Sequence, residues 1–302
     1  MNRVLVTGAQ GYIGGAIARK LAEAGYAVQG GIRRDGVLPA GIAPVITGDL
    51  ADAGLDLVGL DAVVHAAGLG HRRGVTPEIW RRANIDAAVN VARQAREAGV
   101  RRLVLVSTAH VHGRVHEGVV HDETAPNPMD DYAASKLRAE REMATVFGAG
   151  LTILRPVAVI GPHCPGNLQL LMNFLRRGLP LPFGAIANRR SFIEVGDLAR
   201  LVELVLASAA PPGAVLAASP EAISTPDLVR ALAEGLSVRA LLPKIPAAIP
   251  AMAARMLGRG AMWQSLAGSF VAAPKAALGL GWMPRASLRE NLVETARRSV
   301  VS

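Results

Sequence analysis

The sequence has little cysteine, few aromatic residues and no long uninterrupted apolar run. Its single cysteine, Cys164, cannot form an internal disulfide, and no cysteine–histidine cluster has metal-ligand spacing, so we expect neither a disulfide framework nor a metal site. The most apolar stretch, residues 245–257, contains Pro246, Pro250 and Arg255 and is too short to span a bilayer. The chain starts with a strand-like run instead of a secretion signal, which predicts a cytoplasmic protein with no membrane partner.

Acidic residues are outnumbered by basic ones, 24 to 33, which gives a formal net charge of +9. Half of the chain (51%) is apolar and 19% is charged, a composition that excludes a disordered or fibrous protein. The basic residues occur in scattered pairs such as Arg33-Arg34 and Arg101-Arg102, never in runs of five, and few aromatic residues lie between them. We therefore expect no nucleic acid partner, whereas a small anionic substrate fits the positive field.

Short β-branched runs alternate with longer segments of helical period through the first half of the chain. This alternation predicts an α/β fold, a Rossmann-like doubly wound parallel sheet whose strands are covered on both faces. The predicted strands are Val4–Val6, Ala27–Ile32, Pro44–Ile46, Ala62–His65, Leu103–Val106 and Leu151–Leu154, and the predicted helices are Tyr12–Ala24, Pro77–Ala98 and Asp131–Phe147.

After about Pro156, proline and glycine become more frequent and the predicted helices become shorter. This change predicts a dinucleotide-binding domain at residues 1–165 and a smaller C-terminal α/β substrate lobe at residues 166–302, interleaved with the first. The short helices expected in this part are Leu168–Arg176, Asp197–Ala207 and Pro226–Glu234.

Three glycines, Gly8, Gly11 and Gly14, lie between the first predicted strand and the first predicted helix. Glycine permits a tight turn and a close approach of the backbone to a pyrophosphate, and the following helix N-terminus offers free N–H donors. The strand-loop-helix context therefore predicts a dinucleotide-binding loop.

The end of the second predicted strand carries no carboxylate. NAD-binding proteins usually place an acid there to bind the ribose 2′-hydroxyl, but here Ile32 is followed by Arg33 and Arg34. Guanidinium groups suit a 2′-phosphate, so we expect NADP(H), with NAD(H) as the alternative because Asp35 is close by. Asp49, after the third strand, either accepts a hydrogen bond from the adenine amino group or caps a turn.

Tyr132 and Lys136 are four residues apart in a predicted helix and therefore share one face. A phenol has a pKa near 10, and we expect the Lys136 ammonium, together with an oxidised nicotinamide, to lower it for proton transfer. Ser107 and Thr108 end the fifth predicted strand, at the sheet edge where such folds bind ligands, or else cap it. We expect Thr108 to orient a substrate oxygen beside Tyr132, and His110 to contact the substrate.

Together these motifs resemble the extended short-chain dehydrogenase/reductase family, in particular its NAD-dependent epimerase/dehydratase branch, which acts on nucleotide sugars. The resemblance extends over almost the entire chain. It is carried by the glycine loop, Asp49-Leu50, the segment 65–68, Asn84, the strand end 107–113, Tyr132 with Lys136, Arg155-Pro156 and the segment 190–197.

The resemblance implies roles for individual residues. Thr108, Tyr132 and Lys136 would form the catalytic set, with Tyr132 as the acid/base and Lys136 on the nicotinamide ribose. The implied cofactor-binding residues are Gly8, Gly11, Tyr12, Ile13, Gly14, Arg33, Asp49, Leu50, Ala66, Asn84, Ser107, Tyr132, Lys136 and Pro156, and the implied substrate-binding residues are Thr108, His110, Asn167, Phe183 and Arg190.

Two positions depart from the UDP-glucose 4-epimerases that the chain is similar to. Ile32 stands where those enzymes carry an acid, and Ala158 stands where they carry an asparagine. The segment 176–191 instead looks like that of bacterial reductases of nucleotide-linked 4-keto-6-deoxy-hexosamines in polysaccharide synthesis. We therefore expect an NADPH-dependent 4-keto sugar nucleotide reductase. The alternatives are an NAD-dependent UDP-sugar 4-epimerase and a non-catalytic dinucleotide-sensing protein. The resemblance also implies a homodimer paired through the helices Pro77–Ala98 and Asp131–Phe147.

Overall fold

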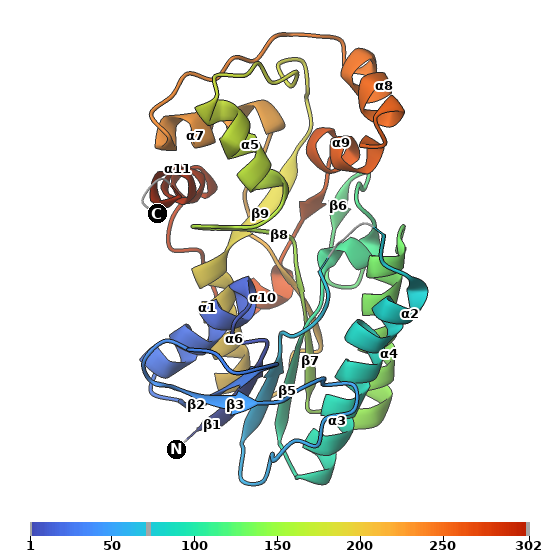
Figure 1. Cartoon of the computed structure of the whole chain (residues 1–302), viewed down its shortest axis with the longest axis vertical. Helices are drawn as coiled ribbons and strands as arrows, with labels where there is room; N and C mark the ends of the chain where they lie inside the picture. Colours follow the sequence, from blue (N-terminus) through green and yellow to red (C-terminus); the bar gives the residue numbers. More distant parts are fainter. Residues whose placement is uncertain (1, 71–73, 300–302) are drawn as a thin grey trace.

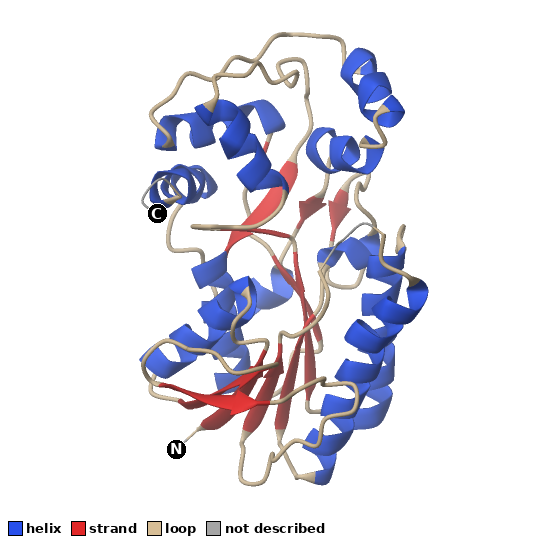
Figure 2. Cartoon of the chain, in the orientation of Figure 1, coloured by secondary structure: helices blue, strands red, loops and turns tan. Residues whose placement is uncertain are grey.

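A computed structural model describes residues 2–70 and 74–299 of the chain, and its centre is a seven-stranded parallel sheet. The order β10-β7-β5-β4-β1-β2-β3 places the first strand near the middle, as in a doubly wound fold (Figure 2). The strands are β1 (Arg3–Thr7), β2 (Ala27–Ile32), β3 (Ile42–Ile46), β4 (Ala62–His65), β5 (Arg102–Val106), β7 (Leu151–Pro156) and β10 (Ala214–Ala217). The Rossmann-like fold predicted from the sequence is confirmed.

Helices cover both faces of this sheet (Figure 1). On one face α1 (Tyr12–Glu23) and α6 (Val195–Ala207) pack against each other. On the other face α3 (Ala87–Glu97) packs against α4 (Asp131–Phe147). Each face has its own apolar core, because successive side chains of a strand point to opposite sides of the sheet.

The predicted helix Pro77–Ala98 is interrupted. It consists of α2 (Pro77–Trp80), a π-helical turn η1 (Arg81–Asp86) and α3. The third strand also differs from the prediction, since β3 lies at the sheet edge and exposes most of its residues instead of being covered on both faces. An edge strand has a neighbour on one side only, so it can remain partly solvated.

The smaller lobe contains a three-stranded sheet of order β11-β9-β8 and a cluster of helices. Its apolar core includes Met172, Leu175, Leu232 and Leu292. The elements of this lobe are β8 (Ala158–Ile160), α5 (Asn167–Arg176), β9 (Arg190–Glu194), β11 (Ala222–Ile223), α7 (Thr225–Gly235), α8 (Ala248–Met256), α9 (Gly260–Ala267) and α11 (Leu288–Arg298).

Short elements connect the two lobes. A two-stranded pair joins β6 (Val119–Val120) to β12 (Val271–Ala272), η2 (Ala109–His112) follows β5, and α10 (Lys275–Gly279) contacts β10. Within the described residues, no helix is long and apolar enough to cross a membrane, and no group of three or more His, Cys, Asp or Glu residues is arranged to hold a metal ion.

The chain passes between the lobes more than once. Both α6 and β10 lie beyond residue 165 in the sequence, yet α6 packs on α1 and β10 pairs with β7, with Val215 opposite Leu154. Conversely, β8 lies before residue 165 and pairs with β9 in the smaller sheet. The ranges 1–165 and 166–302 therefore exchange elements in the folded chain.

Candidate active site

The loop between β1 and α1 requires its glycines. Gly8 has φ +71°, and a Cβ atom there would lie 2.9 Å from the backbone of Ala67. A Cβ atom on Gly14 would lie 2.2 Å from the carbonyl oxygen of Gly8. Only glycine fits such close backbone approaches, so the tight loop predicted from the sequence is present.

The N-terminus of α1 has the properties of an anion site. Gly11 is the N-cap, none of the described side chains caps the helix, and the first helical bond runs from the Gly15 N–H to the Gly11 carbonyl at 2.8 Å. The N–H groups of Tyr12, Ile13 and Gly14 precede that bond, so they have no partner in the helical ladder. Free donors at the positive end of a helix dipole suit a pyrophosphate, and this chain therefore fits a dinucleotide.

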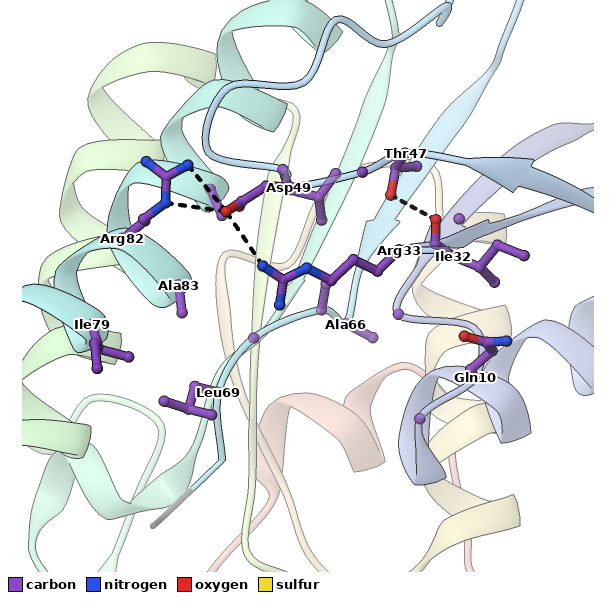
Figure 3. A pocket seen from close by; sticks show the side chains of 18 residues that line it. Gln10, Ile32, Arg33, Thr47, Asp49, Ala66, Leu69, Ile79, Arg82 and Ala83 are labelled. Atoms are coloured by element: carbon purple, nitrogen blue, oxygen red, sulfur yellow. Dashed lines mark hydrogen bonds and ion pairs between the residues drawn. The ribbon is translucent and has the colours of Figure 1, made fainter. Parts of the chain in front are cut away.

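A cavity of about 480 Å³ opens beside this loop, at the carboxyl ends of β1, β2, β3 and β4 (Figure 3). Several residues assigned to the cofactor from the sequence line it, namely Gly8, Gly11, Arg33, Asp49, Leu50 and Ala66. Ile32 also lines this cavity and is buried. An apolar side chain therefore occupies the position at the end of β2 where NAD-binding proteins usually carry an acid.

Asp49 lies between two arginines at the rim of this cavity (Figure 3). Its carboxylate is 3.4 Å from Nη2 of Arg33 and 3.1 Å from Nε of Arg82, and it accepts a hydrogen bond from the Ala51 N–H at 3.2 Å. The Ala51 bond and the two arginines keep the pKa of Asp49 below its ordinary value. Arg82, in η1, was not singled out in the sequence, because nothing local indicates that η1 brings it to Asp49.

Tyr132 lies in the first turn of α4, and its hydroxyl is hydrogen-bonded to Thr108. The helix starts at Asp130, whose side chain accepts from the Ala133 N–H at 2.8 Å. The ring of Tyr132 lies 5.6 Å from that of Trp80 and 6.5 Å from that of His110. The structure thus places Thr108, His110 and Tyr132 together, as the sequence predicted.

Burial raises the pKa of Tyr132, and the Thr108 hydrogen bond only partly offsets this effect. The Lys136 ammonium donates to the Val106 carbonyl at 3.1 Å. The lowering of the Tyr132 pKa by Lys136 together with an oxidised nicotinamide stays a prediction. Burial lowers the pKa of Lys136 to about 8, and Glu140 opposes that shift.

Asn84 links the segment after β4 to helix α4. Its side chain accepts from the Leu69 N–H at 2.8 Å and donates to the Ser135 hydroxyl at 3.0 Å. A Cβ atom on Gly68 would lie 2.9 Å from Oδ1 of Asn84 and 3.4 Å from Nζ of Lys136. Gly68 also lines the cavity, so the segment after β4 lies next to both the cavity and Lys136.

Glu140 is a residue of this site that the sequence analysis missed. It is buried one helical turn after Lys136, accepts a hydrogen bond from the Ser107 hydroxyl and forms an ion pair with Arg155 at 2.7 Å. Arg155 also lies 3.3 Å from Nε2 of His112. The spacing of four residues after Lys136 was the available signal, because it places a carboxylate on the same helix face.

Other residues assigned from the sequence surround this centre or lie in the smaller lobe. Pro156 ends β7, and Asn167 begins α5 at a second cavity of about 250 Å³. Phe183 lines that cavity and stacks on Trp263, with ring centroids 5.6 Å apart. Arg190 is buried and donates to the Gly268 carbonyl at 2.9 Å. Contact of Asn167, Phe183 and Arg190 with a substrate stays a prediction.

Comparisons with known proteins agree with this geometry. A model of the NAD dependent epimerase/dehydratase family matches residues 4–218. The chain is 28% identical to UDP-glucose 4-epimerase from Vibrio cholerae over 97% of this chain and 94% of that protein. It is also 28% identical to the N-acetyl-alpha-D-glucosaminyl-diphospho-ditrans,octacis-undecaprenol 4-epimerase of Escherichia coli O157:H7, over 69% of this chain and 64% of that protein.

Solved structures give the same result. MoeE5 in complex with UDP-glucose and NAD superposes with a TM-score of 0.76 and 27% identity, over 99% of this chain and 100% of that chain. UDP-glucuronic acid 4-epimerase from Bacillus cereus, in complex with NAD, shares the fold with a TM-score of 0.80 and 21% identity, over 99% of this chain and 98% of that one. The resemblance noted in the sequence is confirmed, and the chain belongs to the NAD dependent epimerase/dehydratase family of enzymes.

Proposed function

We propose that this enzyme reduces the 4-keto group of a nucleotide-activated sugar with NADPH. The observation that carries the proposal is the placement of the partly buried Tyr132 phenol, which lies in the first turn of α4, hydrogen-bonded to Thr108 and beside the ring of His110. A phenol positioned in this way can act as a general acid, and reduction of a ketone needs one. The substrate class is supported by the names of the relatives, which include a UDP-glucose 4-epimerase and a protein solved with UDP-glucose.

Each group of residues in the site has its own role in this reaction. The Gly8 loop and the N-terminus of α1 hold the pyrophosphate, and the nicotinamide, when bound, supplies a hydride. Tyr132 gives its proton to the substrate oxygen as the carbonyl π bond breaks, so that one C–H and one O–H bond form. Thr108 orients that oxygen, and Lys136 holds positive charge beside the tyrosinate that remains.

An NAD-dependent UDP-sugar 4-epimerase is the second candidate. The similarity to the Vibrio cholerae epimerase over nearly the whole of both chains favours it. The buried Ile32 and the arginine beside it favour the reductase, because they suit a 2′-phosphate better than a free ribose. Dimerisation through α3 and α4 stays a prediction under either function.

The cofactor and the reaction can be tested together. Protein purified without added cofactor is analysed by mass spectrometry, then assayed with NADPH and a UDP-4-keto-6-deoxy-hexosamine, and separately for interconversion of UDP-glucose and UDP-galactose. We expect no retained NAD and NADPH oxidation that depends on the keto sugar. Retained NAD with interconversion would establish the epimerase, and NADPH binding without either reaction would establish the non-catalytic protein.

Arg33 provides a prediction about the cofactor. Replacing Arg33 by alanine should raise KM for NADPH by about tenfold or more, because a charge-assisted hydrogen bond to the 2′-phosphate is lost. The neighbouring Arg34→Ala serves as the matched control, since Arg34 does not line the cavity. KM for NADH should change little in both variants, and equal effects of Arg33→Ala on both cofactors would contradict the NADPH preference.

Lys136 provides a prediction about pH. Its pKa is lowered to about 8, so the ammonium loses its proton as the pH rises through that value and turnover should fall on the alkaline side. Glu140 favours the charged form, so Glu140→Gln should move this alkaline decline to lower pH. Profiles of kcat against pH for both proteins measure the shift. If the alkaline decline in kcat does not move, Lys136 is not the group whose loss of a proton causes it.

A further inference from the structure

The part of the smaller lobe that contains α8 and α9 lacks acidic residues. Residues 235–269 hold four basic residues and no aspartate or glutamate, and the acid-free stretch continues to residue 289. The basic residues are Arg239, Lys244, Arg255 and Arg259. The neighbouring helix α5 contains no acidic residue either. This segment therefore carries positive charge and no acidic residue of its own.

The outward face of α8 is apolar. Ile249, Met252 and Met256 follow the spacing i, i+3, i+7 that places side chains on one helix face, and they are 56%, 57% and 79% exposed. Leu257, directly after the helix, is 73% exposed. An amphipathic helix of a globular protein normally turns its apolar face inward, whereas these three apolar side chains of α8 are exposed.

The inward side of α8 offers it little anchoring. None of the residues of α8 or α9 is buried. The apolar 250 Å³ cavity lies beneath these helices, and its lining includes Pro250, Ala254, Leu257 and Trp263. Figure 1 shows α8 at the end of the molecule farthest from the N-terminus and the seven-stranded sheet. Helix α8 thus lies at the tip of the smaller lobe, away from α4.

We propose that α8 docks this enzyme on an anionic membrane surface, with Ile249, Met252 and Met256 inserted at the interface and Lys244 and Arg255 on lipid phosphates. An interfacial helix combines an apolar face with nearby basic residues. Here the apolar face of α8 has Arg255 on the same helix and Lys244 four residues before its first residue. A second copy of the chain is a poor occupant, because it would bring a face of the same positive charge. The proposal does not depend on the proposed reaction. It differs from the expectation of no membrane partner, which rested on the lack of a spanning segment.

The test is co-sedimentation of the full chain with vesicles. Vesicles of phosphatidylcholine are compared with an equimolar mixture of phosphatidylcholine and phosphatidylglycerol at low salt and at about 0.5 M salt, where screening is short-ranged. We expect binding to the mixed vesicles, weakened by salt, and little binding to the neutral ones. Absence of binding to the mixed vesicles at low salt would overturn the proposal.

Two sets of variants locate the contact. The triple change Ile249→Gln, Met252→Gln and Met256→Gln should weaken vesicle binding by about tenfold or more, since it removes the inserted face. Lys244→Gln and Arg255→Gln should each weaken binding to the anionic vesicles by about fivefold. Val58→Gln, at a position 76% exposed on the other lobe, is the matched control and should bind like the unmodified protein.

Circular dichroism and NADPH binding of the triple variant should match those of the unmodified protein, because the three side chains are exposed. Unchanged vesicle binding by the triple variant would refute the role of α8. Sedimentation velocity adds a last outcome. If the triple change dissociates an oligomer and leaves vesicle binding intact, the face is a protein interface and the proposal fails.

Discussion

Replacing Tyr132 by phenylalanine is expected to lower kcat by about 10² to 10⁴, the range that a positioned general acid contributes. The change removes one oxygen atom, the one bonded to Thr108. The ring contacts with Trp80 and His110 remain available to phenylalanine, so the fold should persist. Steady-state kinetics with NADPH and a keto sugar nucleotide measure the loss, and KM for NADPH should stay within a few fold.

Tyr26→Phe is the matched control for this prediction. Tyr26 also carries a partly buried phenol, but it precedes β2, at the opposite end of the sheet from the strand ends that form the site. Its replacement should leave kcat unchanged. If Tyr132→Phe retained full activity, Tyr132 would not be the proton donor, and the proposed mechanism would be wrong.

Replacing Glu140 by alanine is expected to lower the free energy of unfolding by about 3 to 5 kcal/mol, because it leaves Arg155 as a buried charge without its carboxylate. Glu140 accepts from Nε and Nη2 of Arg155 and from the Ser107 hydroxyl. Stability of folded domains is about 5 to 15 kcal/mol, so this change removes a large part of it.

The same helix offers the control. Glu142 forms an ion pair with Arg138 at 2.6 Å, but both side chains are exposed. Glu142→Ala should therefore cost about 1 kcal/mol or less. Urea unfolding of the three proteins, compared by midpoint at constant m-value, gives the difference. Equal losses from Glu140→Ala and Glu142→Ala would show that the buried pair does not stabilise the fold.

The sequence predicted the large sheet and most of its helices nearly to the residue. Predicted strands Ala27–Ile32 and Ala62–His65 have those same bounds in the structure, and so does the helix Asp131–Phe147. The reason is that apolar runs and helical periodicity are local signals. The glycine loop and the group of Thr108, Tyr132 and Lys136 were predictable for the same reason.

Features that depend on packing between distant segments were not predictable. The π-helical turn η1 brings Arg82 to Asp49, 33 residues earlier in the chain. The raised pKa of Tyr132 reflects burial under neighbouring elements, whereas the sequence showed only the nearby lysine. The outward apolar face of α8 could not be foreseen either, because an apolar stretch gives no indication of which side the fold leaves uncovered.

The exchange of elements between the lobes has a consequence for dissecting the molecule. A fragment that ended at residue 165 would lack β10 and α6, leaving the β7 edge unpaired and the apolar face of α1 bare. The complementary fragment would lack β8, one of the two partners of β9. Limited proteolysis near residue 165 should therefore yield no stable autonomous piece, and the two halves should melt in a single cooperative transition.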